Sequence, residues 1–285
     1  MGKFLSQEEG ITTPEKLSLP IPIQALASSH NYFSMFLDIK GNVWACGSAR
    51  YGQLGLKMRA AGKSKHLPKM IRSLPAITDI SAGYYHTLFL DEHMHAWATG
   101  YNAYGQLGLG KSKKHTFSPK RLTLPVTIKK VSAGSFHSLF LDTNEQVWAC
   151  GHNKFGQLAL GNCSNVDYPQ LCPGLPAIQL ICGGAHCSTF VDVDGQVWKC
   201  GVGSKSVAEL QERFEGIQYA ECAAHDIFLD EAGNVWVAGA NSQGQLGLGE
   251  SLLTEGIIAV QKLECLPDLA WEQSMFKKTK SARIG

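Results

Sequence analysis

Short apolar stretches separated by polar turns run along almost the whole chain, and residues 80–110 show the pattern most clearly. The apolar run at 80–82 stops at Gly83, a second run over 86–90 ends at Asp91, and a third over 96–99 meets Gly100. Short apolar runs joined by two to four polar residues are typical of antiparallel hairpins. A segment containing proline follows, and proline is tolerated only in edge strands and connections. The pattern therefore predicts three inner strands and one outer strand in each unit.

The same unit returns along the chain, and the tryptophans mark its period. Trp44, Trp97, Trp148, Trp198 and Trp236 are separated by 53, 51, 50 and 38 residues. A fixed period of this size indicates an array or a propeller, and four-strand blades set around an axis leave only short, protected edges. We therefore predict an all-β fold over residues 14–276, a β-propeller of five complete four-stranded blades. Residues 14–20 and 257–276 either help to close the ring or form part of an incomplete sixth blade.

The fourth copy of the unit departs from the pattern. After Gly201 it lacks the GQLGLG stretch that follows the hairpin in other copies, and GSKSVAELQERFEG takes its place. Ser206, with Glu209 three residues later, resembles a capping box, so we predict a short helix over 207–214. The broken repeat represents either drift or a specialised contact surface.

Charge is distributed unevenly, although the whole chain carries a formal net charge of only +2. Residues 40–130 hold 15 Lys and Arg against 3 Asp and Glu, whereas residues 131–272 hold 5 against 17. In a ring this gives a basic half and an acidic half, which either form ordinary solvated surface or steer a charged protein partner. Nucleic acid fits less well, because a surface that tracks phosphates is not expected beside so acidic a half.

The two ends of the chain and its cysteines bear on its location. Residues 1–13 are expected to form a flexible N-terminus, and 277–285 a basic tail that offers at most a weak tether to an anionic membrane surface. No run approaches the ~18–20 apolar residues of a membrane span, and the N-terminus shows no apolar signal-peptide core. Cys46, Cys150 and Cys200 occupy one small slot in different copies, too far apart for disulfides, which favours a reducing compartment. We expect a cytoplasmic monomer, with a nuclear location as the alternative.

The repeated polar residues fit structural roles. His86, His137 and His225 recur once per blade, which spreads them around the ring, whereas a metal needs clustered ligands. We expect each histidine to form a hydrogen bond that locks its loop to a strand. The aspartates that end strands are expected to be turn residues, namely Asp38, Asp91, Asp142, Asp192 and Asp230. The chain shows no catalytic carboxylate pair, no Ser/His/Asp order and no nucleotide fingerprint, so we predict no catalytic site, no metal and no cofactor.

The loop before each repeated histidine is the candidate binding site. In radial blades these loops, at 31–32, 84–85, 135–136, 185–186 and 223–224, should open on one face. Tyrosine is enriched in protein interfaces because its rigid ring adds contact area while its hydroxyl stays hydrated. The alternative is that these rings pack under neighbouring loops. The candidate partner-binding residues are Asn31, Tyr32, Tyr84, Tyr85, Ser135, Phe136 and His186.

The units resemble the repeats of the regulator-of-chromosome-condensation family. The blade of that family carries a G-x-x-H-s-l-x-L-D, G-x-V-W-x-x-G and G-Q-L-G-L-G series, and several copies here match all three parts in order over roughly residues 14–268. The founding member is an exchange factor for the small GTPase Ran, which it contacts with acidic residues and a histidine in this loop face. The stretch GGAHCSTFVD at 183–192 is similar to the loop that contributes the histidine, so the resemblance assigns that role to His186. The acidic positions are not matched, because Tyr84, Tyr85, Ser135 and Phe136 stand there.

The resemblance thus implies a protein-binding propeller that acts on a small GTPase of the Ran or Ras type, as an exchange factor or a GTPase-binding effector. The compact chain also resembles bacterial effector proteins built from these repeats, which act in the cytosol of a host cell. Other proteins with this repeat are binding platforms without exchange activity. Two alternatives therefore stay open: an interaction scaffold for another protein, and a chromatin or nucleic-acid binder that uses the basic half.

Overall fold

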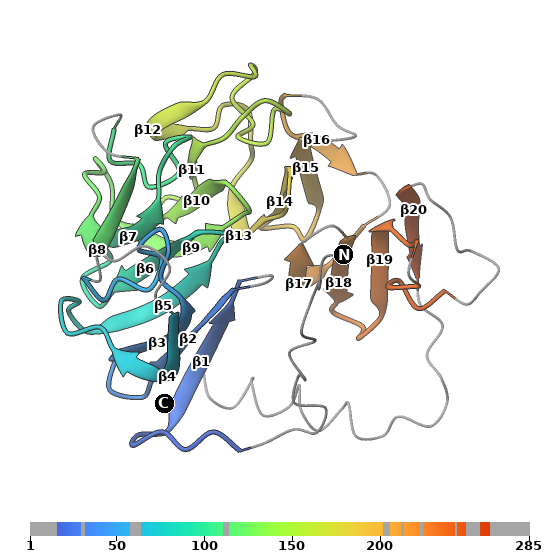
Figure 1. Cartoon of the computed structure of the whole chain (residues 1–285). Coiled ribbons are helices and arrows are strands. Elements are labelled where there is room, and N and C mark those ends of the chain that lie inside the picture. Colours follow the sequence, from blue (N-terminus) through green and yellow to red (C-terminus); the bar gives the residue numbers. More distant parts are fainter. Residues whose placement is uncertain are drawn as a thin grey trace, which may run out of the picture.

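The computed structural model of the protein describes residues 16–29, 32–57, 64–110, 114–201, 206–211, 214–222, 225–242, 244–248 and 257–262. Every regular element in these ranges is a β-strand, and the strands form five antiparallel sheets of four strands each (Figure 1). In each sheet the strands follow one another in chain order. The prediction of an all-β fold with five four-stranded blades is confirmed. No helix in these ranges is long and apolar enough to span a membrane.

Each blade is a meander of four consecutive strands. Blade 1 contains β1 (Ile23–Ser28), β2 (Phe33–Asp38), β3 (Val43–Ser48) and β4 (Ser64–Met70). Blade 2 contains β5 (Ile77–Ala82), β6 (His86–Asp91), β7 (Ala96–Tyr101) and β8 (His115–Arg121). Blade 3 contains β9 (Ile128–Ala133), β10 (His137–Asp142), β11 (Val147–Gly151) and β12 (Val166–Leu171). Blade 4 contains β13 (Ile178–Gly183), β14 (Cys187–Asp192), β15 (Val197–Gly201) and β16 (Glu209–Gln211). Blade 5 contains β17 (Ile217–Cys222), β18 (His225–Asp230), β19 (Val235–Ala240) and β20 (Ile257–Lys262).

The blades succeed one another around a common axis, with the first strand of each innermost. β1 contacts β5, β5 contacts β9, β9 contacts β13 and β13 contacts β17 (Figure 1). Blade 5, in brown to red, and blade 1, in blue, stand apart in Figure 1, and no described strand lies between them. The described part of the chain is therefore an open ring. The expected flexible N-terminus (1–13), the basic tail (277–285) and residues 263–276 lie outside the described residues, so how the ring closes stays a prediction.

Each hairpin between the second and third strands is built around one aspartate and one tryptophan. In blade 2, Asp91 Oδ1 accepts the backbone N–H groups of His93 and His95, both at 2.9 Å, and Oδ2 accepts the Trp97 indole N–H at 2.8 Å. The same indole bond recurs in the other four blades at 2.9–3.0 Å. Burial alone would raise the pKa of Asp91, but the hydrogen bonds outweigh it and the pKa is lowered. The strand-ending aspartates are thus turn residues, as predicted.

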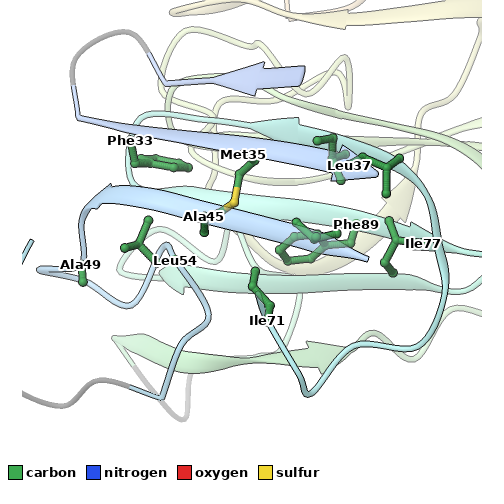
Figure 2. Close-up of a cluster of buried hydrophobic side chains, with 11 residues drawn as sticks. Phe33, Met35, Leu37, Ala45, Ala49, Leu54, Ile71, Ile77 and Phe89 are labelled. Atoms are coloured by element: carbon green, nitrogen blue, oxygen red, sulfur yellow. The ribbon is translucent and has the colours of Figure 1, made fainter. Parts of the chain in front are cut away.

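The hydrophobic core lies between the blades. We call the face of a blade that meets the following blade its forward face, and the opposite one its rear face. The forward face of blade 1 consists of Met35, Leu37, Val43 and Ala45. Phe89 on the rear face of blade 2 packs into this cluster (Figure 2), and Phe140 and Phe190 are fully buried at the same position of blades 3 and 4. Because burying one such side chain contributes about 1.5–3 kcal/mol, these contacts fix the angle between successive blades.

Buried histidines add a polar link between blades. Ser138 Oγ of blade 3 donates to the Gln106 carbonyl at 2.6 Å, so its lone pair is free to accept His86 Nε2–H of blade 2 at 3.0 Å. His137 and Ser188 repeat this bond between blades 3 and 4 at 2.9 Å. Complete burial lowers the pKa of His86 to about 4 and that of His137 to about 3, so both are neutral at pH 7. Their role is structural, as predicted, but the bond joins two blades instead of a loop and its own strand.

Blade 4 is built differently, and the predicted helix over 207–214 is wrong. β16 is a strand that pairs with β15, with Leu210 opposite Trp198. Pairing at the outer edge of the blade outweighs the helix propensity of the local sequence. Where blade 3 has Ala149, blade 4 has Lys199, which forms an ion pair with Asp226 of blade 5. Burial opposes the charge on Lys199, but the attraction of Asp226 outweighs it and raises the pKa of this lysine.

Candidate functional site

Two sets of loops meet at one end of the blades. One set precedes the second strand of each blade, and the other follows the third strand. Gly100 shows how closely the two sets approach: its φ of 113° is accessible mainly to glycine, and an added Cβ would overlap the Tyr85 carbonyl oxygen. The next residue, Tyr101, donates its backbone N–H to that oxygen at 2.8 Å. The loop before β6 and the end of β7 therefore place their tyrosines together, with the rings of Tyr85 and Tyr101 6.2 Å apart.

The aromatic side chains of these loops form one connected surface, which we call the aromatic stripe. Tyr32 of blade 1 stacks on Tyr85 of blade 2 with ring centroids 5.6 Å apart. Tyr84 of blade 2 stacks on Phe136 of blade 3 at 5.7 Å, and Tyr84 lies 5.4 Å from Tyr85. Separations of roughly 4.5–7 Å are those of favourable aromatic pairs. The structure thus brings together the aromatic residues predicted on blades 1 to 3.

The stripe continues to blade 4 through residues that the sequence analysis did not single out. Tyr104 lies 5.5 Å from Phe136 and 4.9 Å from His152. Phe155, 5.9 Å from His152, lies 4.8 Å from His186, the predicted residue of blade 4. The whole stripe consists of Tyr32, Tyr51, Tyr84, Tyr85, Tyr101, Tyr104, Phe136, His152, Phe155 and His186.

A short sequence signal could have found three of the missed residues. Tyr51, Tyr104 and Phe155 each stand directly before the Gly-Gln-Leu of their copy. That position belongs to the loop after the third strand, and this loop lies against the loop before the second strand of its blade. An aromatic residue at either position therefore adds to the same face.

The two ends of the stripe are its most accessible parts. Tyr32 and Phe155 are each 45% exposed, and His186 is exposed as well. The central rings, such as Tyr85 and Phe136, are half-buried against one another. The central rings therefore fit, in part, the alternative that these residues pack beneath neighbouring loops. The exposed ends of the stripe do not fit it.

One predicted residue does not add to this surface. Ser135 is buried, its carbonyl accepts the Tyr84 N–H at 3.2 Å, and its own N–H donates to the Gly184 carbonyl at 3.0 Å. It links blades 2, 3 and 4 through its backbone and offers no side-chain area. Asn31 and the loop at 223–224 lie outside the described residues.

Positive charge borders the stripe. The Arg50 guanidinium lies 5.5 Å from the centroid of the Tyr51 ring, a cation–π contact. A hollow of about 710 Å³ on the outer rim is lined by Lys57, Lys114 and Lys120, together with 115–118. It begins beside the stripe, because His115 pairs with Tyr101 in the ladder between β7 and β8. A partner seated on the stripe would meet aromatic rings first and basic groups at the edge.

The chemistry of the stripe suits binding. Burial, followed by the hydrogen bond that the Tyr85 hydroxyl donates to Tyr32, raises the pKa of Tyr85, so its hydroxyl is neutral at pH 7 and remains a hydrogen-bonding group. In the part of the chain that the structure describes, no three His, Cys, Asp or Glu side chains gather to hold a metal ion. The buried His86 is occupied by its bond to the next blade and does not reach the stripe's surface.

The five four-stranded blades, set one after another around a common axis, define a β-propeller, and the aromatic stripe lies at one end of its blades. The family model of the regulator of chromosome condensation (RCC1) repeat matches residues 40–90, 95–141 and 144–191, and a second model of this repeat matches 77–106 and 128–157. The chain belongs to the regulator of chromosome condensation repeat family.

Individual relatives agree with this assignment. The probable E3 ubiquitin-protein ligase HERC6 of Homo sapiens is 31% identical over 271 residues, which are 84% of this chain and 26% of HERC6. The chain therefore spans about a quarter of the length of that relative. The structure of human WBSCR16 is similar with a TM-score of 0.76 at 19% identity, covering 87% of this chain and 70% of the other. Prp20p from Saccharomyces cerevisiae gives a TM-score of 0.65 at 19% identity, with coverages of 93% and 61%.

Proposed function

We propose that the chain binds a small GTPase of the Ran or Ras type through the aromatic stripe and promotes release of the bound nucleotide. The observation that carries the proposal is the unbroken series of ring contacts from Tyr32 on blade 1 to His186 on blade 4. The repeat family supports the class of partner. So does the likeness in fold to Prp20p, whose structure was described with its binding to Gsp1p and histones.

Nucleotide release of this kind needs no covalent chemistry. It requires a surface that binds the nucleotide-free GTPase more tightly than the loaded one, because only a difference in affinity shifts the equilibrium. Rings that already pack on one another lose little side-chain freedom on binding, which favours affinity. The basic hollow beside the stripe would attract an acidic edge of the partner and speed association. The proposed site of action is the cytosol.

The test is the release of a fluorescent nucleotide from a Ran-type and a Ras-type GTPase. Tyr32→Ala and Phe155→Ala remove the two exposed ends of the stripe without opening a core, and each is expected to slow the accelerated release about tenfold, as for a modest interface hot spot. Tyr168→Ala is the matched control, because Tyr168 is 63% exposed on β12 and lies outside the stripe. Acceleration that survives both stripe variants would contradict the assignment of the site.

The same assay separates the alternatives. Binding that depends on Tyr32 and Phe155 without faster release identifies a GTPase-binding effector. A lack of binding to either GTPase leaves the scaffold for another protein. The third outcome is binding to DNA. If this binding weakens steeply as the salt concentration rises and is lost in the double variant Lys114→Glu with Lys120→Glu, the function is assigned to the basic hollow instead.

A further inference from the structure

Two cysteines lie on the innermost strands where blade 4 meets blade 5. Cys182 is near the end of β13, and Cys222 ends β17. The two strands contact each other, as Figure 1 shows, although the two residues are 40 positions apart in the chain. Both cysteines carry free thiols. The register of the strands therefore decides whether the two thiols meet.

Cys182 occupies a position from which a side chain reaches the next blade. In the strand ladders it takes the place of Ser81 in blade 2 and Ser132 in blade 3. Ser81 Oγ accepts the Ala133 N–H of the following blade at 2.9 Å. Ser132 Oγ accepts the Gly183 N–H in the same way, also at 2.9 Å. The Cys182 side chain is therefore directed at the matching residue of blade 5.

That matching residue is Cys222, whose side chain is directed back toward blade 4. In the ladders it takes the place of Gly183 in blade 4. A Cβ added at Gly183 would lie 2.6 Å from the Gly134 nitrogen of the preceding blade, so this position faces backward across the interface. Burial, followed by the hydrogen bond that the Cys222 thiol donates to Cys182, raises the pKa of Cys222. The two thiols are therefore hydrogen-bonded neighbours on different blades.

The surroundings of the pair favour reaction at Cys182 first. Cys182 is partly exposed, whereas Cys222 is only 6% exposed. The positive charge of Lys199 interacts with the Cys222 thiol, and a cation beside a thiol favours the reactive thiolate form. A small oxidant can thus reach Cys182, and Cys222 is the enclosed thiol that can react next.

A second pair of neighbouring cysteines lacks this access. Cys172 and Cys200 lie in the core between blades 3 and 4 and are at most 5% exposed. Their thiols donate hydrogen bonds to the carbonyls of Leu158 and Gln157. Burial raises the pKa of Cys200 to about 12, so very little thiolate is present at pH 7. These two cysteines serve as an internal control.

We propose that Cys182 and Cys222 form a site of oxidative modification, at which hydrogen peroxide converts the two thiols into a disulfide that joins blades 4 and 5. The Cys182 thiol loses its proton to water, and its sulfur attacks one peroxide oxygen, so that an S–O bond forms and the O–O bond breaks. The hydroxide that leaves takes up a proton and becomes water, and Cys182 is left as a sulfenic acid.

The second step closes the disulfide. The Cys222 sulfur attacks the Cys182 sulfur, so that the S–S bond forms and the S–O bond breaks. The hydroxide that leaves takes the Cys222 proton and becomes the second water. The two thiols lose two electrons in all, and the peroxide takes them up. A cross-link that closes a loop of about 40 residues restricts the unfolded chain, so the oxidised protein is more stable than the reduced protein.

Peptide mapping under non-reducing conditions tests the site. The reduced full chain is treated with hydrogen peroxide, its remaining thiols are blocked after unfolding, and its peptides are identified by mass spectrometry. A disulfide between Cys182 and Cys222 of the same chain is expected, while Cys172 and Cys200 remain thiols. Cys182 that stays reduced, stops at a sulfinic acid or pairs with another cysteine would overturn the proposal.

Two substitutions borrowed from the other blades provide an independent check. Cys182→Ser installs the serine that stands at this position in blades 2 and 3, and Cys222→Ala installs the alanine found there at 82 and 133, so both variants should fold. Peroxide should raise the Tm of the parent, measured without reductant, by roughly 5 °C or more, and should leave the Tm of both variants unchanged.

The control for this check is Cys163→Ser, because Cys163 is exposed. It should respond to peroxide as the parent does, and a reducing agent should reverse the response in both proteins. An equal rise of the Tm in Cys222→Ala, or no rise in a cross-linked parent, would contradict the proposal.

Discussion

The interface between blades 2 and 3 and that between blades 4 and 5 join the same strand faces by different chemistry. Between blades 2 and 3, the buried His86 makes a neutral hydrogen bond to Ser138. Between blades 4 and 5, Cys187 stands where the histidine would be, and Lys199 pairs with Asp226. A neutral pair is vulnerable to protonation, whereas a buried ion pair is vulnerable to loss of one partner.

The lost turn of blade 4 explains why the chemistry changes. In blades 1 to 3 the carbonyl of the glutamine in the Gly-Gln-Leu turn accepts a hydroxyl of the next blade, as Gln106 accepts from Ser138. Blade 4 lacks this turn, so a hydroxyl at position 226 would have no such acceptor. Asp226 with Lys199 replaces the missing bond, which indicates that the two residues compensate for the altered repeat.

The largest effect is expected from breaking this ion pair. Lys199→Met leaves the Asp226 carboxylate, 2% exposed, without its counter-charge, and should lower the free energy of unfolding by about 3–5 kcal/mol. Lys199→Met with Asp226→Asn removes both charges and should recover at least half of the loss. Urea unfolding measures both variants, and a double variant no more stable than the single one would refute the compensation.

A medium effect, confined to acid, is expected at the neutral interfaces. Unfolded histidine titrates near pH 6.5, whereas burial lowers the pKa of His137 to about 3 in the folded state. The unfolded state then binds more protons, so stability is lost as the pH falls from about 6.5 toward 3. Between pH 7 and pH 4.5 the loss due to His137 should be about 2–3 kcal/mol.

The variant His137→Gln isolates this contribution from the acid response of the carboxylates. Between pH 7 and pH 4.5, the free energy of unfolding of His137→Gln should fall by about 2–3 kcal/mol less than that of the parent. Tyr168→Ala, an exposed substitution on β12 that leaves the histidines and the Lys199–Asp226 pair intact, should keep the parent's pH dependence over this range. Equal acid loss in parent and His137→Gln would show that this buried histidine is not held neutral.

The smallest effect is expected where a glycine makes room for the histidine. A Cβ added at Gly134 would overlap the His137 ring, and Gly134→Ala should cost about 1–2 kcal/mol through overpacking. In a His137→Ala background the added methyl group should cost less, because its nearest neighbour is gone, although the Gly184 carbonyl oxygen, 2.7 Å from the added Cβ, remains. Additive effects in thermal unfolding would show that the two residues do not share the space.

The repeat made most of the fold predictable, because each blade restates the same pattern of strands. One unit was enough to predict that Asp91 is a turn residue. Its radial repetition predicted that the loops with Tyr32, Tyr85 and Phe136 lie at the same end of the blades. The helix predicted over 207–214 failed because pairing with β15 is a tertiary effect that local propensity does not contain.

Contacts between blades were the hardest to predict from sequence. That His86 bonds to Ser138 depends on how neighbouring sheets face each other, which no single repeat encodes. The inclusion of Tyr104 and Phe155 in the stripe depends on two loops of a blade that are apart in sequence. Ser135 was predicted on the surface from its loop position, but its place between two neighbouring loops buries it.

Site-specific photo-crosslinking tests most directly that the aromatic stripe is the partner-binding surface. We would place p-benzoylphenylalanine at position 155 or, as the control, at position 168, and irradiate each protein with a nucleotide-free Ran-type GTPase. The account predicts a crosslink from position 155 and none from position 168. Crosslinking from position 168, or from neither position while the two proteins still bind, would contradict it.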